Sequence, residues 1–378
     1  MADQAFAELL DLIRKPQIGG EVLTADIQPV HAALFDAKGD ALLASAIGLL
    51  PSTSGALAAV RDFFGERWNT GDVAVTNDMD AGAVNACEII AVAPVHSSDG
   101  LVGWSVVRGR VPDLGGWEPG GYSPQAVDRW AEGARIEPVK LIANGNYRRE
   151  VTDLLQLNSR TPATTLRNIQ RLAKAAVELG RAYSGDHVKL ADLISAQRSD
   201  EDRRAVAAIA SLPQTSSPQR GALTVPWSNE RFGDIEVRVA KASGTLRVGL
   251  TSPPMAGRPI NLGRFAAQDI VTAATAQACG LESLSTDALP SRVEVSVETP
   301  SLLAAPLPVT VGLGRQTSGQ ALFRATAAAL GLAGEQIETG WQHYRDTVCG
   351  TGFDPRTGKL ATVNATSVRE RQSEEVVA

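Results

Sequence analysis

Residues 71–95, "GDVAVTNDMDAGAVNACEIIAVAPV", run from one short apolar segment through a polar loop into a second apolar segment. Both apolar segments are rich in valine, isoleucine and alanine, as buried strands are. The loop and the start of the second segment carry Asp78, Asp80, Asn85 and Glu88. We therefore expect two neighbouring strands whose ends bring carboxylate and amide side chains together.

This polar cluster has two interpretations on residue chemistry alone. Together with Asp113, which precedes a Gly-Gly turn, its carboxylates could bind a hard cation such as magnesium or manganese, which prefers oxygen ligands. Alternatively, Asn77 and Asp78 cap a turn and Glu88 is a solvent-facing strand residue. No histidine lies in the cluster. Residue types alone leave both interpretations open.

The rest of the chain alternates between helical and strand-like patterns, which predicts a mixed α+β fold with several layers of sheets and helices. We expect helices over residues 4–14, 54–65, 161–184, 190–212, 264–279 and 317–331. We expect strands or hairpins at residues 30–44, 71–78, 87–95, 101–111, 234–252, 292–298 and 307–314. The glycine-rich residues 111–122 break this pattern, and irregular backbone between strands is a common place for a binding site.

The length of 378 residues predicts more than one domain. Residues 213–221, "PQTSSPQRG", are polar and contain two prolines, so they are the best candidate for a linker. We expect an N-terminal domain over residues 1–212, a strand-rich domain over residues 213–365 and a charged tail over residues 366–378.

Composition excludes several classes of protein. The formal net charge is −6 and the basic residues are scattered, so no basic face for nucleic acid is expected. Cys87, Cys279 and Cys349 lie far apart and form no C-x-x-C pair, which fits a reducing compartment. Because neither a signal peptide nor a membrane span is visible, we expect a cytoplasmic protein with no membrane partner.

Residues 311–320, "VGLGRQTSGQ", place spaced glycines between an expected strand and an expected helix. Such a loop can bind phosphate on free backbone N–H groups. The Walker pattern, however, needs lysine after its last glycine, and Gln320 follows Gly319 here. We expect a tight turn and an ordinary Thr or Ser helix cap.

Several collinear blocks resemble the hydantoinase B/oxoprolinase family. Its G-D-V-x-x-x-N-D-P-Y-x-G-G-T-H-x-x-D pattern matches residues 71–88 without a gap. Its next block, an Arg, then His-His, then x-D-I-G-G, is similar to "RGRVPDLGG" at 108–116. Further blocks correspond to "EGARIEPVKL" at 132–141, "NSRTPATTLRNIQ" at 158–170, "GLTSPPMAGRPIN" at 249–261 and "GFDPRTGK" at 352–359. The resemblance covers residues 28–365 and implies a hydantoinase B-like fold.

The same resemblance implies that the family metal site is lost. Asn85 stands at a ligand histidine, Glu88 at a ligand aspartate, and Arg110 and Val111 at the His-His pair, while Asp113 is kept. Arginine has no lone pair for a metal, so Arg110 is expected to neutralise Glu88 or Asp113 by a salt bridge. We therefore expect no metal or other cofactor on this chain. Ser52 likewise stands in a segment where family members carry a histidine.

The family further implies an A-type partner that binds ATP and magnesium, or pairing with an intact B-type subunit. The first expectation is a degenerate subunit of an ATP-dependent cyclic-amide hydrolase or ketone carboxylase complex, with a structural or regulatory role. The second is an altered, metal-independent enzyme in which Arg110 and Asp113 act on an anionic substrate or intermediate. The third is a small-molecule binding module that uses the loop around Trp117. The candidate binding residues are Asp78, Asn85, Glu88, Gly115, Gly116 and Trp117.

Overall fold

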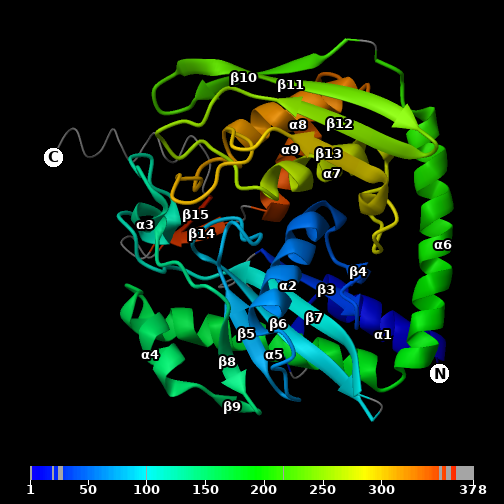
Figure 1. Ribbon diagram of the computed structural model, residues 1–378, viewed down its shortest axis with the longest axis vertical. Helices are drawn as coiled ribbons and strands as arrows, with labels where there is room; N and C mark the ends of the chain where they lie inside the picture. The colour runs from blue at the N-terminus through cyan, green and yellow to red at the C-terminus, as the bar shows by residue number, and fades with distance from the viewer. Residues whose placement is uncertain are drawn as a thin grey trace.

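The computed structural model describes residues 2–18, 21–23, 29–98, 100–215, 217–348, 351–354 and 359–362. Two main β-sheets, with helices on and between them, make up this part of the chain (Figure 1). The expected mixed fold of sheets and helices is therefore confirmed. No helix among these residues is long and apolar enough to cross a membrane.

The larger sheet has the strand order β4-β3-β7-β6-β5-β8-β9, and each neighbouring pair is antiparallel. Its strands are β3 (Val30–Asp36), β4 (Ala41–Ala44), β5 (Val73–Thr76), β6 (Glu88–Ser97), β7 (Gly100–Arg110), β8 (Val139–Ala143) and β9 (Asn146–Tyr147). Residues 71–95 thus form β5, a loop and most of β6. In the β6–β7 register, Glu88 lies opposite Arg110 and Ile90 opposite Arg108.

Helices cover both faces of this sheet. Successive residues of a strand point to opposite faces, so neighbouring residues of β6 contact different helices. Ile90 and Val92 of β6 pack with α2 (Leu50–Phe64), while Ile89 and Ala91 pack with α5 (Pro162–Ser184). Glu88 and Arg108 belong by the same alternation to the α2 side. A sheet buried on both faces explains why its strands read as nearly continuous apolar runs.

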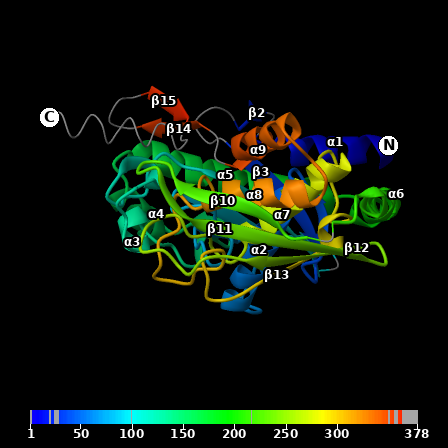
Figure 2. The ribbon, with the colours of Figure 1, turned by 90° about the horizontal axis from the view of Figure 1, so that it is seen from above.

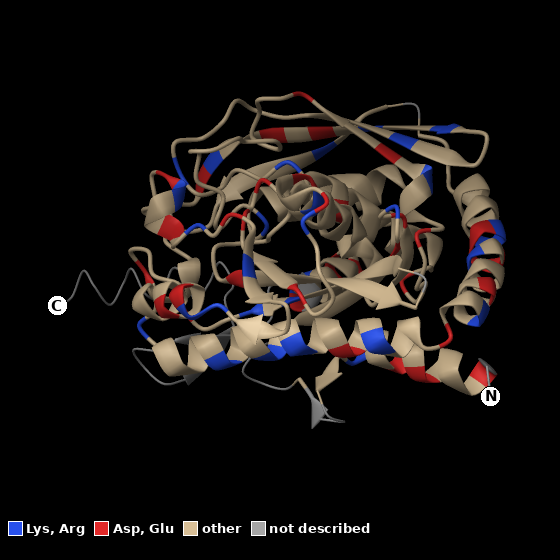
Figure 3. Ribbon diagram, turned by 60° about the horizontal axis from the view of Figure 1, so that its bottom comes forward, with Lys and Arg blue, Asp and Glu red and all other residues tan. Residues whose placement is uncertain are grey.

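The smaller sheet has the order β10-β11-β12-β13, in which only β13 is parallel to its neighbour. Its strands are β10 (Gln219–Val225), β11 (Glu230–Ala242), β12 (Thr245–Thr251) and β13 (Val293–Val297). Helices α7 (Ala266–Cys279) and α8 (Ser318–Ala329) lie between the two sheets (Figures 1 and 2). Helix α6 (His187–Ser211) connects the two halves along one side of the molecule, and acidic and basic residues intermingle along it (Figure 3).

The remaining elements are short or lie at the margins of the sheets. They are α1 (Ala2–Arg14), α3 (Arg129–Glu132), α4 (Arg149–Leu157), α9 (Glu335–Val348), β1 (Gln17–Ile18), β2 (Glu21–Val22), β14 (Thr351–Asp354) and β15 (Lys359–Thr362). The division expected at residue 213 falls in the loop between α6 and β10 and stays a prediction. Residues 219–221 of the expected linker belong to β10. The expected tail, 366–378, lies outside the described residues.

The strand expected over residues 307–314 is wrong, because backbone N–H groups of this segment bind a side chain. The Glu132 Oε1 atom accepts hydrogen bonds from the backbone N–H of Val311 at 2.8 Å and of Gly312 at 2.6 Å, and also from the Thr310 hydroxyl. The expected Thr cap is also absent, since the Thr317 side chain does not cap α8. The N–H groups of Val311 and Gly312 do bind an acidic group, but that group is a carboxyl of the same chain.

Glu132 comes from the larger-sheet half of the sequence, so this contact fixes residues 310–312 against it. Burial raises the pKa of Glu132 to about 7, although the three hydrogen bonds favour the charged form. The Oε2 atom is buried and no partner for it is seen in the described part of the chain. Because its pKa is raised, the Glu132 carboxyl keeps its proton in the folded chain at pH values where the same carboxyl in the unfolded chain has lost it.

We expect the pH to alter the difference in unfolding free energy between the wild type and a Glu132→Gln variant. The stabilising contribution of the raised pKa is complete below the ordinary carboxyl value of 4.5 and is lost as the pH rises through about 7. The wild type should therefore lose on the order of 3 kcal/mol relative to the uncharged variant between pH 4.5 and pH 8. Urea unfolding of both proteins at both pH values measures this difference in unfolding free energy. A difference that does not change with pH would contradict the raised pKa of Glu132.

Candidate functional site

Glu88 forms a buried, bidentate ion pair with Arg108. Arg108 Nε donates to Oε1 at 2.9 Å and Arg108 Nη2 donates to Oε2 at 2.7 Å. The Val84 backbone N–H adds a third hydrogen bond to Oε2 at 2.6 Å. Burial alone would raise the pKa of Glu88, but the charge and hydrogen bonds of Arg108 hold it below its usual value. Glu88 is thus an ionised, buried residue, and the interpretation that placed it on a solvent-facing surface is wrong.

Arg108 is fully buried, and its remaining donors reach α2 and the loop before β6. Its Nη1 atom donates to the Ser52 hydroxyl at 2.8 Å and the Thr53 hydroxyl at 3.0 Å, and its Nη2 atom donates to the Gly82 carbonyl at 3.0 Å. Both hydroxyls in turn donate to the Leu49 carbonyl. Every guanidinium nitrogen of Arg108 therefore has an acceptor.

A second buried ion pair adjoins the first through Ser52. The Ser52 backbone N–H donates to Asp269 Oδ1 at 2.9 Å, and Asp269 Oδ2 accepts from Arg315 Nη2 at 2.7 Å. Arg315 also donates to the Tyr344 hydroxyl at 2.5 Å. We call Glu88, Arg108, Ser52, Asp269 and Arg315 the ionic network. It carries two positive and two negative groups and links the larger sheet to α7 and the start of α8.

Asn85 and Arg110 meet at Tyr122 from the glycine-rich loop. Asn85 Nδ2 donates to the Tyr122 hydroxyl at 2.9 Å, while Asn85 Oδ1 accepts from the Cys87 backbone N–H at 2.9 Å. The Arg110 guanidinium lies 4.7 Å from the Tyr122 ring centre and donates to the Gly120 carbonyl at 3.2 Å. This geometry is a cation–π contact.

Asp113 is fully buried and is paired with Arg160. Its Oδ1 accepts from Arg160 Nη1 at 2.8 Å and its Oδ2 from the Arg160 backbone N–H at 2.6 Å. The ion-pair partners of Glu88 and Asp113 are therefore Arg108 and Arg160, in place of the expected Arg110. Val111, at the other His-His position, is buried, and its backbone N–H donates to the Cys87 carbonyl.

The remaining candidate residues lie in different surroundings. At Gly116, with φ +85°, a Cβ atom would approach the Glu132 carbonyl carbon to 2.6 Å, and at Gly115 one would lie 3.0 Å from the Asn158 oxygen. Both glycines are thus needed for close backbone packing. Trp117 is largely exposed. Asp78 pairs with Arg135 at 3.1 Å, so its carboxylate is engaged outside the ionic network.

The residues at the family's metal positions do not fit a divalent cation. Both Glu88 oxygens are taken by a guanidinium group, and Arg110 stands directly opposite Glu88 in the sheet. Burial raises the pKa of Cys87 to about 11, so this neighbouring thiol stays protonated. Throughout the described ranges, no group of three or more His, Cys, Asp or Glu side chains could hold a metal ion.

Sequence reasoning did not single out Arg108, Asp269 or Arg315. A signal for Arg108 exists, because it is a charged residue within the apolar run "GWSVVRGR" of an expected buried strand. A charge in that position requires a partner. Asp269 and Arg315 lie in α7 and just before α8, and local spacing gives no indication that the fold brings them to Ser52.

We expect an Arg108→Met variant to lose about 3–5 kcal/mol of unfolding free energy, because Glu88 would stay buried without its counter-ion. Arg247→Met is the matched control, since Arg247 pairs with Glu294 at 2.9 Å on the surface, with side chains 64% and 59% exposed. That control should cost less than about 1 kcal/mol. Urea unfolding of both variants measures the losses, and equal losses would refute the special role of the buried pair.

Comparison with known proteins places these residues in a family. The Hydantoinase B/oxoprolinase family matches residues 25–369. The beta subunit of the caprolactamase from Pseudomonas jessenii is 40% identical over 108 residues, which are 29% of this chain and 19% of that protein. The B component of a putative D-/L-hydantoinase from Pseudomonas sp. (strain NS671) is 26% identical over 271 residues, 66% of this chain and 45% of that protein. The matches therefore span less than half of these relatives.

Two solved structures share the fold. The ATP-dependent caprolactamase from Pseudomonas jessenii superposes with a TM-score of 0.74 at 24% identity, over 96% of this chain and 63% of that chain. A nucleotide-free acetone carboxylase superposes with a TM-score of 0.67 at 17% identity, over 92% of this chain and 48% of that chain. The match to the family over nearly the whole sequence is decisive: the chain belongs to the hydantoinase B/oxoprolinase family.

Proposed function

We propose that this chain is a non-catalytic B-type subunit of an ATP-dependent cyclic-amide hydrolase or ketone carboxylase complex. The observation that carries the proposal is the pairing of Glu88 with Arg108, which occupies both carboxylate oxygens at a family metal position. Asn85 and Arg110, at two further ligand positions, are engaged with Tyr122. An intact scaffold whose ligand positions are filled by internal contacts suits a structural or regulatory role.

The proposal includes a heteromeric complex in which ATP and magnesium bind to another chain. Relatives of this chain carry names of subunits, including the caprolactamase beta subunit and the acetophenone carboxylase delta subunit. We infer that the partner is an A-type ATP-binding subunit, an intact B-type subunit, or both. This chain would then supply surface and geometry to the complex rather than a reacting group.

The structure gives less support to an altered enzyme that uses Arg110 and Asp113. Asp113 is fully buried, and both of its oxygens accept hydrogen bonds from Arg160. Arg110 is 5% exposed and lies against Tyr122. Neither group is presented to an incoming substrate.

We expect the purified chain, alone or with an A-type partner, to contain less than about 0.1 equivalent of manganese, iron, zinc or cobalt, because the ligand positions lack lone pairs or are committed elsewhere. Elemental analysis by plasma mass spectrometry measures it. An intact B-type family member purified in the same way is the control and should retain its metal. The chain should co-elute with its partner without metal-dependent turnover of a cyclic amide or ketone. Stoichiometric metal together with such turnover would overturn the proposal.

A further inference from the structure

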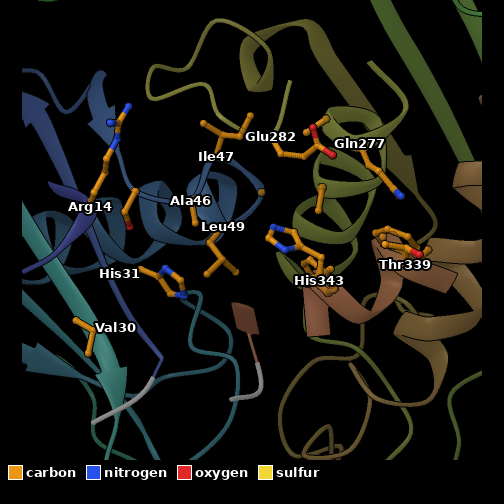
Figure 4. A pocket seen from close by; sticks show the side chains of 17 residues that line it. Arg14, Val30, His31, Ala46, Ile47, Leu49, Gln277, Glu282, Thr339 and His343 are labelled. Carbon is orange, nitrogen blue, oxygen red and sulfur yellow. The ribbon is translucent and has the colours of Figure 1, made fainter. Parts of the chain in front are cut away.

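A cavity of about 660 Å³ lies apart from the residues at the family's metal positions. It opens between β3, the segment 45–49 that leads into α2, and helices α7 and α9 (Figure 4). Its volume falls in the range of small-molecule sites, about 300–1,000 Å³. Its lining includes none of Asn85, Glu88 and Arg110.

Part of the wall is apolar and closely packed. Ile47, Leu49 and Phe323 supply large hydrophobic surfaces. At Gly48 a Cβ atom would lie 2.9 Å from Ala273 Cβ, and at Gly340 one would overlap the Gln277 side chain. The segment before α2 therefore packs closely against α7, and α9 packs closely against the Gln277 side chain of α7. Such walls suit a short hydrocarbon chain.

The polar part of the lining favours an anion. The imidazoles of His31 from β3 and His343 from α9 lie on facing sides of the cavity and point into it (Figure 4). Arg14, at the end of α1, lies on the His31 side, and Glu282 lies nearer to His343. The lining thus contains one guanidinium and two imidazoles but a single carboxylate. Guanidinium and imidazole N–H groups form charge-assisted hydrogen bonds with carboxylates.

The cavity also adjoins the ionic network. Tyr344 lines the cavity and accepts a hydrogen bond from Arg315, which pairs with Asp269. An occupant of the cavity would therefore lie next to a chain of contacts that continues to Ser52 and Arg108. This connection runs from the cavity to the residues at the family's metal positions.

We propose that this cavity binds a small organic carboxylate, with its head group at Arg14 and His31 and its apolar chain against Ile47, Leu49 and Phe323. The apolar wall disfavours a purely inorganic anion as the preferred ligand, and the N–H donors of Arg14, His31 and His343 favour a carboxylate head group over an organic cation. The assignment rests on the lining residues and is independent of the proposed role in a complex.

Isothermal titration of the full chain with four probes tests this site: hexanoate, hexylamine, hexan-1-ol and inorganic phosphate. Hexanoate is expected to bind more tightly than each of the other three. The double variant Arg14→Gln/His31→Gln should weaken hexanoate binding by about tenfold or more, because charge-assisted hydrogen bonds to the carboxylate are lost. Glu282→Gln should bind hexanoate as tightly as the wild type or more tightly, since it removes a like charge.

Two further variants separate occupancy from folding. Thr339→Trp fills the cavity from an exposed position on α9 and should abolish hexanoate binding while the melting temperature stays unchanged. His187→Gln, at the start of α6 and outside the cavity lining, should bind like the wild type. Equal binding of hexanoate and hexylamine, phosphate binding as tight as hexanoate, or full binding by the Thr339→Trp variant would each overturn the proposal. So would no detectable binding of hexanoate at millimolar concentration.

Discussion

The burial of one guanidinium group, Arg108, constrains the centre of this molecule. Its acceptors come from three separate places: the Glu88 carboxylate of β6, the hydroxyls of Ser52 and Thr53 at the start of α2, and the carbonyl of Gly82. A buried charge without such partners would cost several kcal/mol. The helix, the strand and the loop before the strand must therefore come together around β7. The α2 helix is thereby fixed on one face of the larger sheet.

The same constraint decides what the family's metal position can do. In this chain the carboxylate at that position has one more methylene group than aspartate, and it reaches Arg108 in a bidentate geometry. Arg110, which lies opposite Glu88 on the neighbouring strand β7, adds a second cation. A divalent ion bound to Glu88 would have to displace the Arg108 guanidinium and would be repelled by the positive charge of Arg110. Under the proposed non-catalytic role these residues act together, because Glu88 pairs with Arg108 while Asn85 and Arg110 contact Tyr122.

The sequence predicts the regular elements well, because most of them follow from local periodicity. The strands at residues 88–97 and 100–110 and the helix at 162–184 occupy the expected places. The expectations omit α4, α9 and β8. One further error arises where a distant side chain decides the outcome. The segment 307–314 has the composition of a strand. However, the backbone N–H groups of Val311 and Gly312 donate to the Glu132 carboxyl and so cannot donate to a neighbouring strand. No pattern within the segment reveals that carboxylate.

The site shows the same division between local and long-range information. The resemblance identified the positions of Asn85, Glu88 and Arg110, and the structure places Glu88 and Arg110 opposite each other. Strand alternation does not decide which arginine pairs with Glu88, because Arg108 and Arg110 are two residues apart and belong to the same face of the sheet. The pairing depends on the acceptors that α2 and Gly82 offer to Arg108 and on the contact of Arg110 with Tyr122. The pairing of Asp113 with Arg160 depends likewise on the approach of residues 158–161 to the glycine-rich loop. Such choices are made in three dimensions and are invisible to spacing along the chain.

A double-mutant cycle on Arg108 and Glu88 tests the central claim most directly. The unfolding free energies of the wild type, Arg108→Met, Glu88→Gln and the double variant give the coupling energy between the two side chains. A coupling of about 2–3 kcal/mol is predicted, because each single variant leaves a buried polar group without its partner. A coupling below about 0.5 kcal/mol would show that the two side chains act independently and would contradict the account.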